Sequence, residues 1–228
     1  MAAEPEVATA AVDARARRRQ EHRDLNRNQV LDAAETVFGE KGYEAATLKE
    51  VAERAGFAVG SVYMFFAGKA DLFRQLFIRR GHEHLEGMTV AATTPGSPIE
   101  QLHALVDHQV DFFRRHPDFG RLYLRYTGPV MLSAERRAEQ SMTEEYDRAM
   151  ALEADLFVRG QAAGEIVDGD PTALAQLFSG MMSAFHAIDP EVISEALPAG
   201  RGFTVSDLHE MVERAFHTEQ PGHRGAAT

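Results

Sequence analysis

The sequence predicts an all-α fold of about nine helices. Apolar residues recur at helical spacing along most of the chain, and capping residues and glycines mark the ends of these stretches. No stretch alternates between polar and apolar residues for long enough to form a half-buried strand. With 228 residues, of which 44% are hydrophobic and 26% charged, the chain can bury a sizeable core.

The first helix is expected to begin at Asn26, whose side chain can cap it while Gln29 reaches back to the cap. Its apolar stripe consists of Val30, Leu31, Ala34, Val37 and Phe38. Gly42 is expected to end this helix in a left-handed conformation. Residues 1–25, which include five arginines, are expected to form a flexible basic arm.

Two short helices are expected next. Thr47 and Glu50 form a T-x-x-E capping box at the start of the first one, and Gly56 ends it. The second must begin three or four residues after Gly56, because Val62 and Phe66 provide the next apolar face at helical spacing. Two short helices joined through a glycine turn form a helix-turn-helix.

Six further helices are expected in the rest of the chain. Their ranges are about 69–86, 97–115, 118–127, 133–163, 171–189 and 206–217. Ser97, Ser133, Asp170 and Ser206 are the expected caps at the starts of four of them. The loop 87–97 contains Pro95 and Gly96 and is the best domain boundary, which separates a domain 26–86 from a domain 87–228.

Composition and charge exclude several classes of protein. The absence of cysteine excludes disulfides, cysteine-based zinc sites and thiol catalysis, and it favours a reducing cytoplasm. The longest uncharged stretch, 171–188, is short for a membrane span, so no membrane partner is expected. The net charge of −11 is uneven, with 13 Lys and Arg against 10 Asp and Glu in residues 11–80 and 11 against 23 in residues 81–228. Only the first part is suited to contact phosphates.

The helix-turn-helix is the part of the sequence that best fits a binding site. In such a motif the second helix enters the major groove of DNA, so it needs an apolar inner face, here Val62 and Phe66. The candidates for its outer face are Val59, Gly60, Ser61, Tyr63, Met64 and Phe65. A helical hairpin with no DNA role fits the same spacing.

A nearly unbroken pattern runs through residues 26–80. It consists of Phe38, Gly42-Tyr43, Thr47, Val51-Ala52, Ala55-Gly56-Phe57, Gly60-Ser61-Val62-Tyr63-Met64-Phe65-Phe66, Lys69 and Leu72-Phe73. This pattern resembles the N-terminal domain of the TetR (tetracycline repressor) family of bacterial transcription regulators. The resemblance implies that Thr47, Tyr63 and Lys69 contact phosphate, and that Lys49 reaches a base edge or the DNA backbone. It also implies that the outer residues form the recognition helix, although Ala58 stands where the family commonly has a capping residue.

Enzyme signatures are absent or incomplete. Gly68-Lys69 is followed by Ala70 in place of the Ser or Thr of a phosphate-binding loop, and no G-x-S-x-G motif occurs. His103 and Asp107, four residues apart, could share a metal ion, but a hydrogen-bonded or exposed pair explains them better. We therefore expect no catalysis, no cofactor and no metal.

The C-terminal part contains rings and methionines that could surround a cavity for a small ligand. The candidate contacts are Gln109, Phe112, Phe113, Tyr123, Tyr126, Met142, Tyr146 and Phe178. Each of them also fits an ordinary core position. The expected ligand is largely apolar, with Tyr126 or Tyr146 as its polar anchor.

The last two long helices present wide apolar faces. The family resemblance implies that they form a four-helix interface with a second copy of the chain. The candidate interface residues are Leu174, Phe178, Met181, Met182, Phe185, Leu208, Met211, Val212 and Phe216. A monomeric core explains the first of these two helices almost as well.

Together these features predict a transcription regulator, with a repressor as the expected type. It would bind palindromic operator DNA as a homodimer and be released by a small, largely apolar effector. The alternative is a helical ligand-binding or scaffold protein that has lost DNA binding. The arginine-rich arm either enters a neighbouring minor groove or stays a solvated tail.

Overall fold

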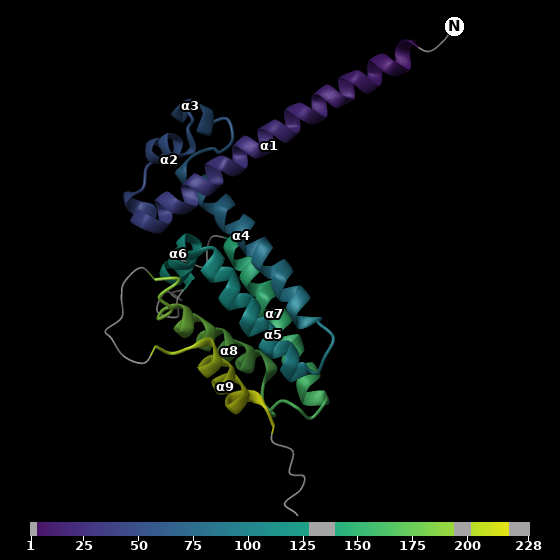
Figure 1. The fold of residues 1–228 in the computed structure, drawn as a ribbon, viewed down its shortest axis with the longest axis vertical. Coiled ribbons are helices and arrows are strands. Elements are labelled where there is room, and N and C mark those ends of the chain that lie inside the picture. Colours follow the sequence, from purple (N-terminus) through teal and green to yellow (C-terminus); the bar gives the residue numbers. More distant parts are fainter. Residues whose placement is uncertain (1–3, 128–139, 194–201, 219–228) are drawn as a thin grey trace, which may run out of the picture. The chain divides into compact units, whose positions relative to one another are not determined.

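The computed structural model describes residues 4–127, 140–193 and 202–218, and these ranges contain nine α-helices and no β-strand (Figure 1). The expected all-α fold is confirmed. The chain divides into two compact units, Met1–Leu76 and Phe77–Thr228. The division falls inside α4 (Lys69–Ala92), so this helix contributes residues to both units.

The first helix, α1 (Glu4–Ala45), is longer than the sequence suggested. Asn26 lies inside it, so the prediction that Asn26 is its N-cap is wrong. The cause is helix propensity, because no Gly or Pro occurs between Pro5 and Gly39 and alanine and arginine are frequent there. Gly42 interrupts the helical geometry with a φ of 77°, which confirms the expected break.

The helices α2 (Leu48–Ala55) and α3 (Val59–Val62) form the predicted helix-turn-helix. The capping box is present, since the backbone N–H of Glu50 donates to Thr47 Oγ1 at 3.3 Å and the backbone N–H of Thr47 donates to Glu50 Oε2 at 2.9 Å. Gly56 ends α2 with a φ of 75°, and the N–H of Phe57 donates to the carbonyl of Ala52 at 2.9 Å. Each expectation for α2 is confirmed.

The core of the N-terminal unit joins α1, α2, α3 and the start of α4. Its fully buried side chains are Val30, Leu31, Phe38, Val51, Val62 and Leu72, with Phe66 only 2% exposed. The ring of Phe73 packs edge-on against Phe38 and Tyr43, at centroid distances of 5.3 and 4.8 Å. Burial of Val62 and Phe66 confirms the inner face predicted for the second helix of the motif.

The C-terminal unit consists of the rest of α4 and five more helices. These are α5 (Pro98–Arg115), α6 (Pro117–Thr127), α7 (Gln140–Ala162), α8 (Pro171–His186) and α9 (Val205–Phe216). In this unit α5 contacts α6, α7, α8 and α9 and is therefore the central helix. Phe157, Phe178 and Phe216 pack edge-on against one another in the core.

The helix caps of this unit follow the sequence signals with one exception. Ser97 and Asp170 cap α5 and α8 as predicted. The N-cap of α9 is Thr204, which pairs with Asp207 in a capping box, so the assignment of Ser206 as the cap is wrong by two residues. The expected cap Ser133 lies outside the described residues.

Helix α4 runs six residues past its expected end at Glu86. Tertiary packing explains the difference, because Met88, Ala91 and Ala92 are buried in the core of the C-terminal unit. Gly87 lies within the helix where the imidazole of His108 approaches it, and a Cβ at this position would lie 2.0 Å from His108 Cε1. A glycine that looks like a helix end in the sequence is therefore a close-packing position.

Candidate functional site

The residues predicted to contact DNA lie on or beside the helix-turn-helix of the N-terminal unit. Thr47, Lys49, Gly60, Tyr63 and Met64 are exposed, whereas Val59, Ser61, Phe65 and Lys69 are partly buried. The exposure of Tyr63 and Met64 reaches 58% and 64%. A ring and a thioether side by side in water are unfavourable unless a partner covers them, so this surface has the character of a contact surface.

The recognition helix is shorter than predicted. Helix α3 ends at Val62, and residues 63–65 continue as a turn in which the N–H of Met64 donates to Ser61 O at 3.1 Å and the N–H of Phe65 to Val62 O at 3.0 Å. The assignment of Tyr63, Met64 and Phe65 to a regular recognition helix is therefore corrected. The N-cap is Ala58, which makes no side-chain cap hydrogen bond, and an uncapped one-turn helix gains little stability of its own.

Lys69 has a role that the sequence did not indicate. Its ammonium donates to the backbone carbonyls of Tyr43, Glu44 and Ala46 at 2.8, 3.1 and 3.0 Å, and it lies 4.5 Å from the centroid of the Tyr43 ring. All three N–H groups are thus used at the C-terminal end of α1, where a cation is favoured. The phosphate contact of Lys69 stays a prediction, and in this structure its ammonium holds the backbone that leads into α2.

Positive charge in the N-terminal unit is partly neutralised. Lys41 pairs with Glu50 at 2.5 Å, Arg54 with Glu40 at 3.4 Å, and Lys49 more loosely with Glu53 at 3.7 Å. Within the described part of the chain, no ion pair involves the exposed arginines of α1, which are Arg15, Arg17, Arg18, Arg19 and Arg23. The unpaired positive charge of this unit therefore lies along α1.

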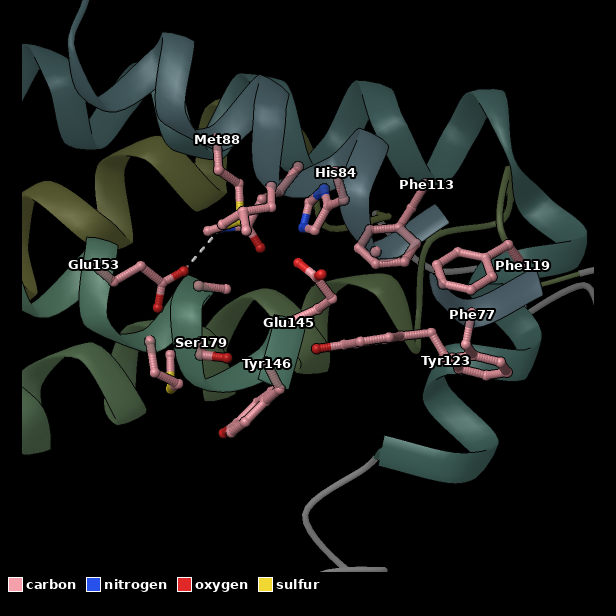
Figure 2. A pocket seen from close by; sticks show the side chains of 15 residues that line it. Phe77, His84, Met88, Phe113, Phe119, Tyr123, Glu145, Tyr146, Glu153 and Ser179 are labelled. Carbon is pink, nitrogen blue, oxygen red and sulfur yellow. Dashed lines mark hydrogen bonds between the residues drawn. The ribbon is translucent and has the colours of Figure 1, made fainter. Parts of the chain in front are cut away.

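The C-terminal unit contains a cavity between its helices (Figure 2). The cavity encloses about 740 Å³ of space between atoms when its open mouth is included. Its lining residues come from α4 to α8. They are Phe77, Gly81, His84, Leu85, Met88, Gln109, Phe113, Phe119, Tyr123, Glu145, Tyr146, Ala149, Met150, Glu153 and Ser179.

Half of the predicted ligand contacts meet in this cavity. Gln109, Phe113, Tyr123 and Tyr146 line it. Phe112, Tyr126 and Phe178 do not, which corrects the prediction. Phe112 and Phe178 are fully buried and pack against other rings, the former on His84 and the latter on Phe157 and Phe216. The side chain of Met142 lies outside the described part of the structure.

The cavity also contains acidic groups that the sequence analysis missed. Glu153 is 2% exposed and accepts one hydrogen bond, from Gln109 Nε2 at 3.3 Å. Burial raises the pKa of Glu153 to about 8. A signal for it existed, because Glu153 and Glu145 continue the apolar stripe of Tyr146, Met150 and Phe157 on α7, where a charged residue is unexpected.

The histidines around the cavity are neutral near pH 7. Burial, together with His108 and His186, lowers the pKa of His84 to about 3. Burial likewise lowers the pKa of His186 to about 4 and lowers that of His108. His84 stacks on His108 at a centroid distance of 5.2 Å, while His186 packs 4.4 Å from the ring of Phe113. These rings therefore act as aromatic surface and not as cations.

Most residues predicted for a dimer interface belong to the core of the chain itself. Phe178, Met182, Phe185, Leu208, Val212 and Phe216 are at most 3% exposed. Their side chains have no surface left for a second copy, so their assignment as direct contacts is corrected. Met211 is 46% exposed, and Leu174 and Met181 are partly buried. The sequence could not separate the two groups because both faces of α8 are apolar.

No helix among the described residues is long and apolar enough to cross a membrane. Within the same residues, no group of three or more His, Asp and Glu side chains is placed so that it could hold a metal ion.

A helix-turn-helix with an outward contact surface, together with a second helical unit that contains a cavity, defines the class of helix-turn-helix transcription regulators. The family described as "Bacterial regulatory proteins, tetR family" matches residues 30–81, and "Tetracyclin repressor-like, C-terminal domain" matches residues 95–187. The chain belongs to the TetR family of bacterial transcription regulators.

Individual relatives agree with this membership. A TetR/AcrR-family regulator from Thermobifida fusca is 30% identical, with 82% of this chain and 94% of that chain covered at a TM-score of 0.59. The HTH-type regulator YfiR of Bacillus subtilis is 29% identical over 163 residues, which are 71% of this chain and 78% of YfiR. The HTH-type repressor KstR of Mycolicibacterium smegmatis is 30% identical over 147 residues, 64% of this chain and 65% of KstR.

Proposed function

We propose that this regulator is a repressor that binds palindromic operator DNA as a homodimer and leaves it when a small, largely apolar effector occupies the cavity. DNA binding is assigned to residues 26–86, and effector binding and dimerisation to residues 87–228 together with the part of α4 from Phe77 onward that lines the cavity. No catalytic step is part of the proposal. The observation that carries it is the exposure of Tyr63 and Met64 beside Thr47 and Lys49 on the helix-turn-helix.

The proposed dimer surface is the outward face of α8 and α9. Leu177 is 56% exposed and Ile188 39%, and they share one side of the α8 region with Gly180 and Ala184 at helical spacing. Met211 contributes from α9 and Phe203 from the segment before it. Small residues between large apolar ones allow a partner helix to approach closely.

The proposed coupling between effector and DNA runs through α4. This helix begins with residues of the N-terminal unit and lines the cavity with Phe77, Gly81, His84, Leu85 and Met88. A ligand that moves these residues changes the geometry in which the helix-turn-helix is presented. Such couplings are typically about 1 to 3 kcal/mol, or roughly 5- to 150-fold in operator affinity.

The test measures binding of the full-length protein to DNA from upstream of its own gene as a function of salt. A dimer on two half-sites is expected to lose affinity with a log-log slope of about −0.9 for each neutralised phosphate. Tyr63→Ala should weaken binding to the operator and to unrelated DNA alike, because its position is expected to contact phosphate, whereas Val90→Ala, which removes an exposed side chain elsewhere, should change neither. Salt-independent or undetectable binding would favour the helical ligand-binding protein without a DNA role.

A further inference from the structure

The cavity of the C-terminal unit contains carboxylate oxygens that lack a partner. Gln109 donates to one oxygen of Glu153, while Glu153 Oε2 is buried and accepts no hydrogen bond from any described residue. Glu145 repeats this arrangement, because Arg148 donates to its Oε1 at 3.2 Å and its Oε2 is buried without a partner. A buried acceptor left without a donor is costly, so both oxygens are free to accept one from a ligand.

The charge of the lining is one-sided. The residues that line the cavity include two glutamates and neither Lys nor Arg, and the one lining histidine, His84, is neutral at pH 7. Burial keeps Glu153 protonated below about pH 8 in the empty cavity, so an anionic group beside it would meet a neutral acid and no compensating cation within the described wall. A positively charged donor would instead donate a hydrogen bond to Glu153 Oε2 and pair with the ionised carboxylate.

The remaining wall is apolar and aromatic. Figure 2 shows Phe77, Phe113, Phe119 and Tyr123 gathered at one end of the cavity, Glu153 and Met88 at the other, and the carboxylate of Glu145 between them. The two glutamates are eight residues apart on α7, which is about 12 Å along a helix at 1.5 Å per residue. The cavity therefore has one acidic end and one aromatic end.

We propose that the cavity takes an amphipathic organic cation, with a primary ammonium group beside Glu153 Oε2 and an apolar or aromatic body that extends past Glu145 to the ring cluster of Phe77, Phe113, Phe119 and Tyr123. This inference rests on the proposed function, which places the effector in the same cavity. It narrows the effector class from largely apolar molecules in general to cationic amines, and it excludes carboxylates and other anions.

The proposal has a proton linkage that separates it from simple hydrophobic binding. In the empty cavity burial holds the pKa of Glu153 at about 8, and a cation beside it lowers that pKa, so binding expels the proton. Affinity for an amine should rise by roughly tenfold per pH unit up to about pH 8. The other titratable groups that face this region are His84 on α4, His108 on α5, Glu145 on α7 and His186 on α8. Burial lowers the pKa of His84 to about 3 and that of His186 to about 4, so both stay neutral between pH 6 and 8, where an alkylamine stays charged; burial also lowers the pKa of His108.

The experiment is calorimetry of the full-length protein with phenylalkylamines of increasing chain length, beside the phenylalkyl alcohols and phenylalkanoates of the same lengths. We expect an amine to bind most tightly, the alcohol more weakly and without the pH dependence, and the carboxylate least. Glu153→Gln should weaken amine binding by about tenfold or more and abolish its pH dependence while leaving the alcohol unaffected. Asp155→Asn, the same chemical change at an exposed position of α7, should leave amine binding unchanged.

Three results would overturn the proposal. These are tighter binding of the alcohols or carboxylates than of every amine, retention of the pH dependence in Glu153→Gln, and an equal loss of affinity in Asp155→Asn. Circular dichroism of Glu153→Gln checks that its fold is intact. Failure of the proposed function gives a different result. If amines bind in this way but do not release the protein from DNA, the ligand class is supported and release by an effector is contradicted. If a non-cationic effector releases the protein from DNA, the proposed function is supported and the ligand class is contradicted.

Discussion

At the scale of a single residue, the burial of Glu153 makes the stability of the chain depend on pH. Its pKa is raised from 4.5 in a solvated glutamate to about 8, so the folded chain holds a proton there that the unfolded chain releases. The folded state binds more protons between these two values, and the contribution of this carboxyl to stability is therefore lost as the pH rises through that window.

Glu153→Gln is expected to have little effect on stability near pH 5 and to stabilise the protein increasingly up to about pH 8. The glutamine keeps the shape and the partner Gln109 but needs no proton. Since each pKa unit corresponds to about 1.4 kcal/mol, the gain at pH 8 should reach a few kcal/mol. Thermal unfolding of the variant and the wild type across this pH range measures it.

The control for this prediction is Asp155→Asn, whose exposed carboxylate should give no such pH-dependent gain. His84 and His186 act in the opposite direction, because their lowered pKa values of about 3 and 4 make the folded chain lose stability as the pH falls below 6.5. The effect of these two histidines on stability therefore lies below pH 6.5. A constant difference between Glu153→Gln and the wild type from pH 5 to 8 would contradict the burial of a titrating carboxyl.

Lys69→Met is expected to reduce stability of the N-terminal unit by about 1 to 3 kcal/mol, because three backbone carbonyls lose their donor. Operator affinity should fall as well, since Ala46 precedes Thr47 and the start of α2 loses its support. The log-log salt slope should stay unchanged if the ammonium contacts no phosphate. A slope smaller by about 0.9 would instead identify Lys69 as a phosphate contact in the complex. Lys49→Met removes an ammonium at an exposed position, and its stability and salt slope are compared with those of Lys69→Met.

At the scale of the helix, the residue at which each helix begins depends on its N-cap. Thr47, Ser97 and Asp170 were readable from the sequence because a cap acts within four residues, and the structure has each of them in place. Helix α3 differs, since Ala58 cannot accept the hydrogen bond from its first N–H groups. The result is a single turn followed by residues 63–65, with Tyr63 and Met64 exposed.

Ala58→Ser is expected to stabilise α3 by about 1 kcal/mol through a new side-chain cap. The order imposed on this segment before it meets DNA should strengthen operator binding, because less conformational entropy is lost in the complex. Calorimetric unfolding and operator titration of the same samples measure the two effects. Ala58→Val lacks a cap and is the matched control. If the serine variant were no more stable than wild type, the lack of a cap would not be what limits α3.

The second copy of the chain is the main expectation at the scale of the whole molecule. The corrected surface contains Gly180, at which an added Cβ meets no atom of the chain within 4 Å. Phe216→Arg and Met182→Arg, which target buried side chains, should unfold the protein instead of separating two folded copies.

Gly180→Gln is expected to convert a dimer into folded monomers. The longer side chain has room within one chain, and glutamine favours a helix by up to about 1 kcal/mol over glycine, so each copy should be at least as stable as before. Light scattering measures the mass and circular dichroism the fold. Val158→Gln, at a 50% exposed position on α7, should keep the dimer. A dimer that survives Gly180→Gln would move the interface away from α8.

Local signals in the sequence were sufficient to predict the helical class, the helix-turn-helix and the N-caps of α2, α5 and α8, because helix propensity and capping act over a few neighbouring residues. They were also sufficient for the family, whose pattern lies in residues 26–80. The length of α1 depends on the absence of helix-breaking residues before Gly39. The length of α4 depends on the packing around Gly87.

The assignment of apolar residues to core, cavity or surface required the packed fold. Leu177 and Phe178 are neighbours on one apolar helix, yet one is 56% exposed and the other fully buried. The ammonium of Lys69 donates to the backbone carbonyls of Tyr43 and Ala46, more than 20 residues earlier in the chain. Glu153 Oε2 is buried without a partner only because α4, α5 and α8 pack around it. Each of these outcomes depends on contacts between distant segments, and side-chain environment in a protein is set by such contacts and not by local sequence.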